Sequence, residues 1–389
     1  MIVVMVCNVG KALLMFLITF VLKDKPLITI GDAIDSFLND SDQTTRGLCL
    51  SSKKSIKAGK FPQYGFEMVK DYDAALVCCY EAMSIQLKNE GFSKDWKADP
   101  VKYRSSVERW FSAVTPARWY SCLALYFCCM LTVTILLVIG VNTANYNNNG
   151  VARSALEFIN LGIGAVTPDT LISGWHLASI GGTTIIASVL ISNIPQMILS
   201  FLYLLFNGVF TSMLLATEWS DFAHKRKPLR VSDPIKGQRS TYFLQLPYRY
   251  AVPLLILSGI LHWSVSQSIF LAQVATYSKD GDLVDNAAIS TCGYSPSVVA
   301  LTMIIGTCLA FFMVLLSVRR YKRGIPLAGS CSAAISAACY GREDVDSAAP
   351  LQWGVTSPEG EEIGHCAFSD KEVRMPVEGR LYAGAMKMD

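Results

Sequence analysis

Charged residues are scarce in this chain of 389 residues: Asp, Glu, Lys and Arg make up only 17% of it, against roughly 25% in an average soluble domain. The deficit is concentrated in long uncharged runs, and a helix of about 20 apolar residues spans the core of a bilayer. The formal net charge of +3 is too small to indicate nucleic-acid binding. The composition therefore predicts an integral membrane protein whose main partner is the lipid bilayer.

The sequence motifs of common enzymes and metal sites are also absent. The twelve cysteines include no C-x-x-C spacing, and the four histidines (His176, His224, His262 and His365) are too scattered to predict a metal site. There is no G-x-S-x-G, H-E-x-x-H or P-loop motif, and His262 with Ser266 lacks the carboxylate that a catalytic triad requires. The sequence thus predicts no enzyme activity, no cofactor and no metal.

Five apolar runs are long enough to cross a bilayer. They are residues 1–22, 119–141, 178–216, 251–275 and 296–318. The first contains Lys11 and lacks a small-residue cleavage site, so we interpret it as a span, with a signal peptide as the alternative. The third run is longer than one crossing needs. It forms either one tilted helix or a hairpin bent near Pro195.

The basic residues between these runs predict the topology. The loop 217–250 contains seven Lys and Arg residues against three acids, and four bases lie within residues 319–323. Cytoplasmic loops collect such an excess, which places both segments inside. If the basic segment before Trp119 is also cytoplasmic, the third run must cross once instead of folding back. The amino terminus, Asn147 and Asp282 are then expected outside, and the carboxyl terminus inside.

The same pattern predicts the organisation of the whole chain. We expect a span at 1–22, a cytoplasmic amphipathic-helical segment at 23–118, a four-span bundle at 119–318 and a cytoplasmic tail at 319–389. The predicted fold class is an all-α transmembrane bundle with cytoplasmic amphipathic helices and a small β-containing tail. The membrane in which it lies, plasma membrane or endomembrane, is left open.

Local patterns predict some elements outside the spans. Apolar residues recur at helical spacing in Ile30–Leu38 and again in 67–87, which indicates amphipathic helices. Small residues every fourth position, beginning with Gly329, predict a closely packed helix over 328–339. Two apolar segments between Gly and Pro residues, 351–355 and 366–369, predict short strands.

Several literal stretches carry a resemblance to a known family. They are Arg239–Tyr250 (RSTYFLQLPYRY), Leu261–Leu271 (LHWSVSQSIFL), Ile30–Ile34 (IGDAI), Glu218–Ser220, Lys227–Arg230, Thr291–Pro296 and Leu351–Gly354. In these stretches the chain resembles a family of uncharacterised fungal membrane proteins with an amino-terminal domain of unknown function. The resemblance covers most of the chain and implies several spans without an established activity. Members usually have a further span ahead of the position of Met1, so the resemblance also implies an amino-terminally short chain.

Polar residues inside the predicted spans are the candidate functional site, because each needs a partner where water is absent. One cluster contains Asn193 and Gln196, and the other contains His262, Ser266 and Gln267. His262 lies near the middle of its span, so we expect a neutral imidazole that bonds to Asn193 or Gln196. The clusters form either a polar pocket or simple bonds between helices. The second interpretation is favoured, because the last four spans contain no acid.

The sequence therefore favours a membrane scaffold or accessory protein that binds protein partners on its cytoplasmic face. A transporter or channel that uses the polar clusters is the alternative. A water-accessible cavity between His262 and Asn193 would distinguish them, because a pathway requires it and a closely packed bundle does not contain one.

Overall fold

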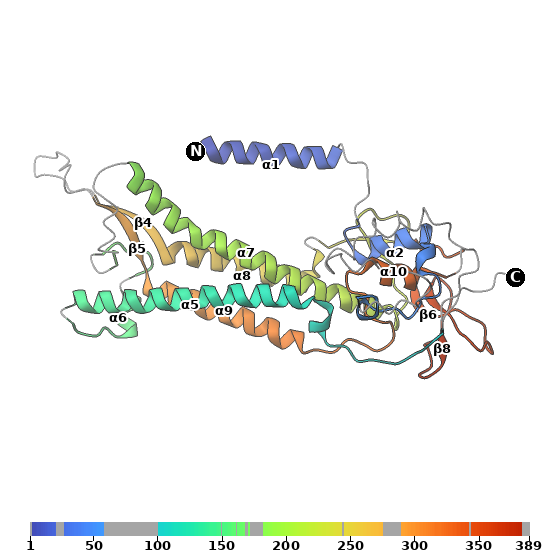
Figure 1. Cartoon of the computed structure of the whole chain (residues 1–389). Coiled ribbons are helices and arrows are strands. Elements are labelled where there is room, and N and C mark those ends of the chain that lie inside the picture. The colour runs from blue at the N-terminus through green and yellow to red at the C-terminus, as the bar shows by residue number, and fades with distance from the viewer. Residues whose placement is uncertain are drawn as a thin grey trace, which may run out of the picture. The chain divides into compact units, whose positions relative to one another are not determined.

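The fold is described from a computed structural model of the chain (Figure 1). The structure describes residues 2–20, 27–57, 100–148, 150–160, 162–167, 170–171, 182–242, 245–274, 289–341 and 344–382. The chain divides into two compact units. Unit 1 contains Met1–Tyr103, Lys225–Thr241 and Cys331–Asp389, and unit 2 contains Arg104–His224 and Tyr242–Ser330. Each unit is therefore assembled from segments that lie far apart in the sequence.

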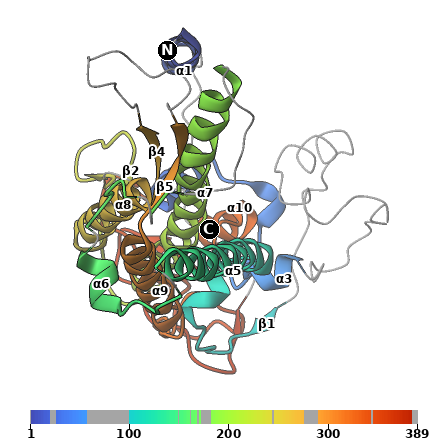
Figure 2. The ribbon, with the colours of Figure 1, turned by 90° about the vertical axis from the view of Figure 1, so that its left-hand side faces the viewer.

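Within the described residues, four helices, all in unit 2, are long and apolar enough to cross a membrane. They are α5 (Pro116–Asn147), α7 (Gly182–Asp221), α8 (Tyr248–Ser268) and α9 (Pro296–Ser317). Both α5 and α8 pack against α7 and α9, so the four helices form a closed bundle, seen from one end in Figure 2. The shortest, α8, has 21 residues and is about 30 Å long, which matches the core of a bilayer. Four of the five predicted spans are thus confirmed as helices of spanning length.

The third predicted span is a single continuous helix. Pro195 lies inside α7, which shows no break there. Proline removes one backbone donor, but helices in membranes tolerate this where neighbouring groups satisfy the freed carbonyl. The hairpin alternative is therefore wrong.

The predicted end of the second span is too early. The polar residues after Val141 predicted a loop, but α5 continues to Asn147. Thr143 donates to the carbonyl oxygen of Ile139 over 2.9 Å, and Ala144 is buried. Polar side chains of this kind are accommodated in the last turns because a hydroxyl can bond back to its own helix.

The predicted end of the fourth span is too late. The apolar run continues past Ser268, but its residues leave the helix as strand β4 (Ile269–Val274), which pairs with β5 (Ile289–Tyr294) as an antiparallel hairpin. The register runs from Ile269 opposite Tyr294 to Val274 opposite Ile289. β-branched and aromatic residues favour strands, and a short apolar run does not by itself distinguish a strand from a helix.

The hairpin is tied to the rest of unit 2. The Tyr294 hydroxyl donates to the Gly140 carbonyl oxygen over 2.6 Å, and its backbone N–H donates to Thr170 over 2.9 Å. Both strands also pack against α7. Two shorter helices complete this unit, η2 (Trp110–Ala113) ahead of α5 and α6 (Ala155–Asn160) after it. The loops that follow α5 and α8 are therefore held together.

Unit 1 is a mixed α and β structure. Its further elements are α2 (Ile30–Asn39), η1 (Gln43–Thr45), α3 (Lys53–Lys57), β1 (Val101–Lys102), β2 (Arg230–Val231), β3 (Arg239–Ser240), α10 (Ser332–Cys339), β6 (Gln352–Val355), β7 (Cys366–Ser369) and β8 (Leu381–Tyr382). β1 pairs with β8 and β6 with β7 antiparallel, and β2 pairs with β3 parallel. The helix predicted at 30–38 and both predicted strands are confirmed, whereas 67–87 lies outside the described residues.

The start of α2 is held by a capping box. Thr29 Oγ1 accepts from the Asp32 N–H over 3.0 Å, and Asp32 Oδ2 accepts from the Thr29 N–H over 2.8 Å. The Thr29 hydroxyl also bonds to the Arg230 carbonyl oxygen over 2.8 Å. A Cβ added at Gly31 would lie only 2.0 Å from that oxygen, so glycine alone fits here. The cap therefore joins the amino-terminal part of unit 1 to β2.

The predicted tail helix is shorter than expected. It begins at Ser332, because Gly329 has φ +59°, a left-handed conformation that lies outside a helix. The helix α10 nevertheless packs closely through small side chains, with Ala334 and Ala337 both 1% exposed, and Ser336 bonds to Thr45 over 2.8 Å. The predicted close packing of this helix is confirmed. The prediction that Gly329 contributes to it is wrong, because Gly329 lies outside the helix.

The first apolar run forms the helix α1 (Ile2–Phe20). The part of it with described side chains, Met5–Phe20, is an apolar helix shorter than the four of the bundle. Lys11 is the charged residue in this part. The large apolar side chains of this segment are exposed. A crossing by α1 stays a prediction.

Candidate functional site

His262 of α8 and Gln196 of α7 form a reciprocal pair. His262 Nδ1 lies 2.7 Å from Gln196 Oε1, and Gln196 Nε2 donates to the His262 carbonyl oxygen over 2.9 Å. An amide oxygen only accepts, so the imidazole donates from Nδ1, and in the neutral form Nε2 is the acceptor. The structure thus contains the bond expected between His262 and Gln196, and it links α7 to α8.

The other three predicted residues do not join this pair. Asn193 is exposed and donates to the Val189 carbonyl oxygen over 2.7 Å. The Ser266 hydroxyl donates to the Trp263 carbonyl oxygen over 2.7 Å, and Gln267 Nε2 donates to Ser266 over 3.4 Å. These polar groups are occupied within their own helices. The grouping of all five residues as one functional site stays a prediction.

The bundle contains a further set of polar atoms that sequence reasoning missed. Asn207 Oδ1, Thr211 Oγ1 and Ser264 Oγ are buried and, among the described residues, have no hydrogen-bond partner. Asn207 and Thr211 lie one turn apart on α7 and share a face. A buried polar group without a partner is costly, so such atoms are candidates for a function. In the sequence, these two residues could have been found from their i, i+4 spacing within an uncharged run.

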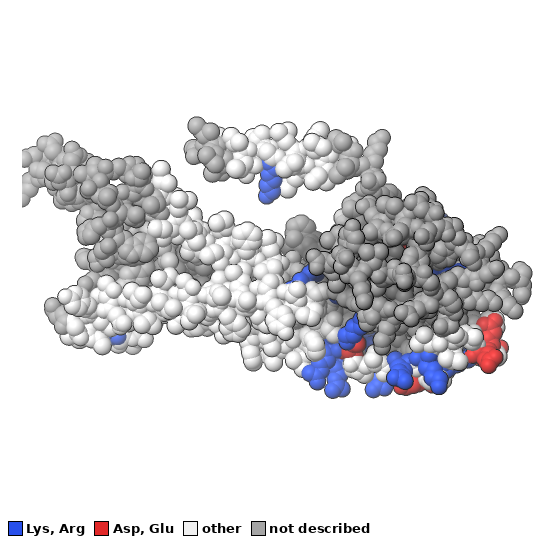
Figure 3. Space-filling model, in the orientation of Figure 1, with Lys and Arg blue, Asp and Glu red and all other residues white. Residues whose placement is uncertain are grey.

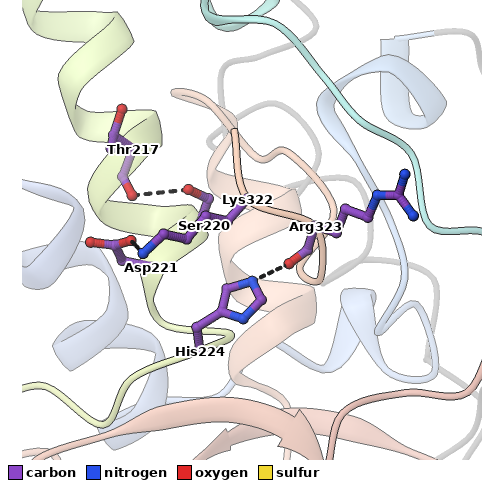
Figure 4. A network of polar contacts seen from close by, with 6 residues as sticks. All are labelled: Thr217, Ser220, Asp221, His224, Lys322 and Arg323. Atoms are coloured by element: carbon purple, nitrogen blue, oxygen red, sulfur yellow. Dashed lines mark hydrogen bonds and ion pairs between the residues drawn. The ribbon is translucent and has the colours of Figure 1, made fainter. Parts of the chain in front are cut away.

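The carboxyl end of α7 is fixed to the chain that follows α9 (Figure 4). Lys322 Nζ lies 2.8 Å from Asp221 Oδ1, and His224 Nε2 donates to the Arg323 carbonyl oxygen over 2.5 Å. These contacts join the ends of two helices that are distant in sequence.

A buried tryptophan strengthens the same connection. Trp219 is 1% exposed, and its Nε1 donates to the Pro326 carbonyl oxygen over 2.9 Å. Next to it on α7, the Ser220 hydroxyl bonds back to the Thr217 carbonyl oxygen over 3.0 Å, as drawn in Figure 4. The ends of α7 and α9 are therefore held at the same end of the bundle.

A short antiparallel bridge also joins the chain ahead of α5 to the chain after α9. We call residues 108–110 and 319–321 the basic bridge. Arg109 lies opposite Arg320, the Trp110 N–H donates to the Arg319 carbonyl oxygen over 2.8 Å, and the Tyr321 N–H donates to Glu108 over 2.9 Å. The segments that enter α5 and leave α9 are thus neighbours.

A buried thiol cluster lies in unit 1. Cys49, His365 and Cys366 are each at most 3% exposed. The hydrogen bond between the two thiols, aided by His365, lowers the pKa of Cys49, whereas this bond and burial raise the pKa of Cys366. The sequence showed His365 beside Cys366 but gave no sign of Cys49 as their neighbour. Among the residues that the structure describes, no group of three His, Cys, Asp or Glu side chains suits a metal ion.

These observations define the class of protein first. A closed bundle of four apolar helices of spanning length fits an integral membrane protein. The chain belongs to the family of the Domain of unknown function (DUF8419), whose model matches residues 29–363. This match confirms that the chain comes from an uncharacterised family, and the matched region includes all four helices of the bundle. No curated protein and no solved structure matches the chain.

Proposed function

We propose that this protein is an integral membrane scaffold or accessory protein, in which the bundle anchors a cytoplasmic unit that binds protein partners. The observation that carries the proposal is the composition of unit 1. It combines the chain ahead of Arg104, the loop Lys225–Thr241 between α7 and α8, and the tail Cys331–Asp389 after α9.

These segments are joined by direct backbone contacts. The Lys227 N–H donates to the Leu351 carbonyl oxygen over 2.9 Å, and the Leu351 N–H donates back over 2.8 Å. The Tyr103 N–H donates to the Arg380 carbonyl oxygen over 2.9 Å. One folded unit cannot lie on both sides of a bilayer, because its backbone groups would have to pair across the hydrocarbon core. The three segments therefore share one side, and α7 crosses once.

The basic residues support the cytoplasm as that side. The loop between α7 and α8 and residues 319–323 carry the excess of Lys and Arg that marks cytoplasmic segments. Residues 27–57 belong to the same unit. On this proposal α1 is a fifth span, with its amino end on the opposite side.

The Gln196–His262 pair supports a scaffold over a pathway. Gln196 bonds to both the ring and the backbone carbonyl oxygen of His262, and these two bonds fasten α7 to α8. Interhelical bonds of this kind stabilise a bundle by about 0.6 kcal/mol each. A transporter or channel is the second candidate, and the buried atoms of Asn207, Thr211 and Ser264 favour it.

Two measurements on the full chain test the choice. Proteins cross-linked to it in native membranes are identified for wild type, for Asn207→Leu with Thr211→Val, and for Lys236→Glu on the exposed loop of unit 1. A scaffold predicts that the bundle variant keeps the wild-type partners and that a charge reversal on unit 1 weakens some of them. A conductance of the reconstituted wild type that Asn207→Leu with Thr211→Val abolishes would support the channel and contradict the scaffold.

A further inference from the structure

Two arginines face each other across the basic bridge. The bonds from Trp110 to Arg319 and from Tyr321 to Glu108 flank the pair Arg109 and Arg320. This pattern defines a non-hydrogen-bonded antiparallel pair, in which the Cα atoms are about 4.5 Å apart and the side chains are closest. Like charges directly opposite each other destabilise a bridge. An anion bound between the two side chains would relieve this repulsion.

The protein supplies no such charge on that face within the described residues. Successive side chains along a strand point to opposite faces, so Glu108 lies on the other face from Arg109. Its charge acts on Tyr321. Burial raises the pKa of Tyr321, and the charge of Glu108 raises it further. Asp221 is paired with Lys322. Arg109 and Arg320 are exposed, and neither forms an ion pair with another described residue.

The opposite face of the bridge is fixed to the bundle. The Trp110 and Tyr321 rings stack with centroids 6.1 Å apart, and both residues are 6% exposed. The Tyr321 hydroxyl reaches the Met213 carbonyl oxygen of α7 at 3.1 Å, and the Arg319 guanidinium lies 5.6 Å from the centre of the Trp110 ring. These contacts fix the backbone that carries the two outward arginines.

We propose that Arg109 and Arg320 bind the headgroup phosphate of an anionic phospholipid. Guanidinium groups match phosphate oxygens with paired hydrogen bonds. Arg109 lies seven residues ahead of Pro116 and Arg320 lies three after Ser317, where a spanning helix meets the headgroups. Clusters of basic residues at that depth bind anionic lipids. This inference rests on the proposed membrane insertion, and it adds a lipid class and a defined site.

The position of the arginines favours a lipid over a free anion. Phe111 is exposed next to the bridge, and Trp119 donates to its carbonyl oxygen over 3.2 Å. Aromatic residues of this kind sit at the headgroup depth of a bilayer. Arg118, also exposed, adds a further positive charge on the first turn of α5. A phosphate presented by the membrane is thus within reach of the site, next to an apolar surface for the acyl chains.

The test uses thermal unfolding of the full chain in phosphatidylcholine nanodiscs, with or without added phosphatidylserine. Phosphatidylserine should raise the Tm of wild type and leave that of Arg109→Gln with Arg320→Gln unchanged. The matched control, Lys236→Gln with Arg239→Gln, removes two exposed positive charges from unit 1 and should respond like wild type. The single exchange Arg109→Glu places a carboxylate opposite Arg320 and should raise the Tm without phosphatidylserine. Inorganic phosphate added to phosphatidylcholine nanodiscs should reproduce little of the lipid effect.

Two results would overturn the site. One is an equal rise in Tm for wild type and the Arg109→Gln with Arg320→Gln variant, and the other is no rise for wild type. If inorganic phosphate raises the Tm as much as phosphatidylserine does, the ligand of the site is a free anion and not a lipid. Resistance of wild type to alkaline carbonate extraction tests membrane insertion separately. Extraction of wild type by carbonate would refute the proposed function itself. Resistance to extraction without a Tm response to phosphatidylserine would refute only the lipid site.

Discussion

The two units use large apolar side chains in opposite ways. In unit 1, Trp353 and Phe368 are 0% exposed, as expected for a core in contact with water on its outside. In the bundle, Phe127, Leu131 and Phe311 are each 64% exposed. On the face shown in Figure 3, the surface over the middle of α5 and α9 carries no Lys, Arg, Asp or Glu. The same residue types are thus buried in unit 1 and exposed on the bundle.

This difference teaches what surrounds each unit. Soluble proteins rarely expose contiguous apolar patches of more than a few hundred Å². Exposed apolar side chains along helices of spanning length fit contact with lipid, where helix packing depends on shape and on polar bonds such as Gln196–His262. The stability of unit 1 should depend on its apolar core, and that of the bundle on close packing.

The difference between the two units is tested most directly by truncating one aromatic residue in each of them. Phe368→Ala should destabilise unit 1 by about 3–5 kcal/mol, because it leaves a cavity in its buried core. Phe311→Ala, the matched change on the exposed surface of α9, should have a much smaller effect. Limited proteolysis in detergent measures the loss for each unit. Equal sensitivity of the two variants would mean that the surroundings of the two units do not differ.

Within the bundle, the polar pair is the next test. His262→Leu should reduce thermal stability in detergent by about 1–2 kcal/mol, since it leaves Gln196 Oε1 without its donor. His262→Gln keeps a donor and an acceptor and should be better tolerated. If the leucine variant melts like wild type, the pair does not hold α7 to α8.

Within unit 1, the capping box offers a comparable local change. Thr29→Ala removes the acceptor of the Asp32 N–H and the bond to Arg230, and should cost about 1 kcal/mol. Thr29→Ser retains the hydroxyl and serves as the control. Amide hydrogen exchange in residues 30–39 reports the effect. Protection unchanged in the alanine variant would show that contacts with β2 alone hold α2.

The smallest expected effect is a pH dependence confined to unit 1. Burial alone would raise the pKa of Asp32, but hydrogen bonds donated by Ser232 and Thr29 outweigh it and lower the pKa. A lowered folded-state pKa gives stability that is present above the unfolded value of about 3.9 and is lost as the pH falls through the folded value. The advantage of wild type over Asp32→Asn should therefore shrink on acidification below about pH 4.

The measurement is the unfolding of unit 1 across that pH range, with Asp40→Asn at an exposed position as the control. A wild-type advantage that does not change with pH would show that the bonds to Asp32 act independently of its charge.

The sequence predicted most of what depends on local pattern. Uncharged length identified α5, α7, α8 and α9, and apolar spacing identified α2. The errors arose where one pattern suits two structures. The run through Ile269–Val274 is apolar enough to continue α8, and only pairing with β5 makes it a strand. Gly329 follows the spacing of the small residues in the tail helix, but it has a positive φ and lies outside that helix.

The candidate sites were predictable only in part. Gln196 was expected as a partner of His262 because both are polar and both lie within apolar runs. The pairing of Arg109 with Arg320 and of Cys49 with Cys366 joins positions more than 200 residues apart. Such contacts depend on how unit 1 and unit 2 assemble from separate segments, and no local pattern encodes that. The three-part composition of unit 1 was missed for the same reason.

The central claim is that unit 1 lies on one side of a membrane that the bundle crosses. Single cysteines introduced at Tyr146, Arg239 and Glu361, in a background without the exposed native cysteines, are labelled with a membrane-impermeant maleimide in sealed vesicles of known orientation. The account predicts that positions 239 and 361 react from the cytoplasmic side and that position 146 reacts from the opposite side. Labelling of positions 146 and 239 from the same side would contradict it.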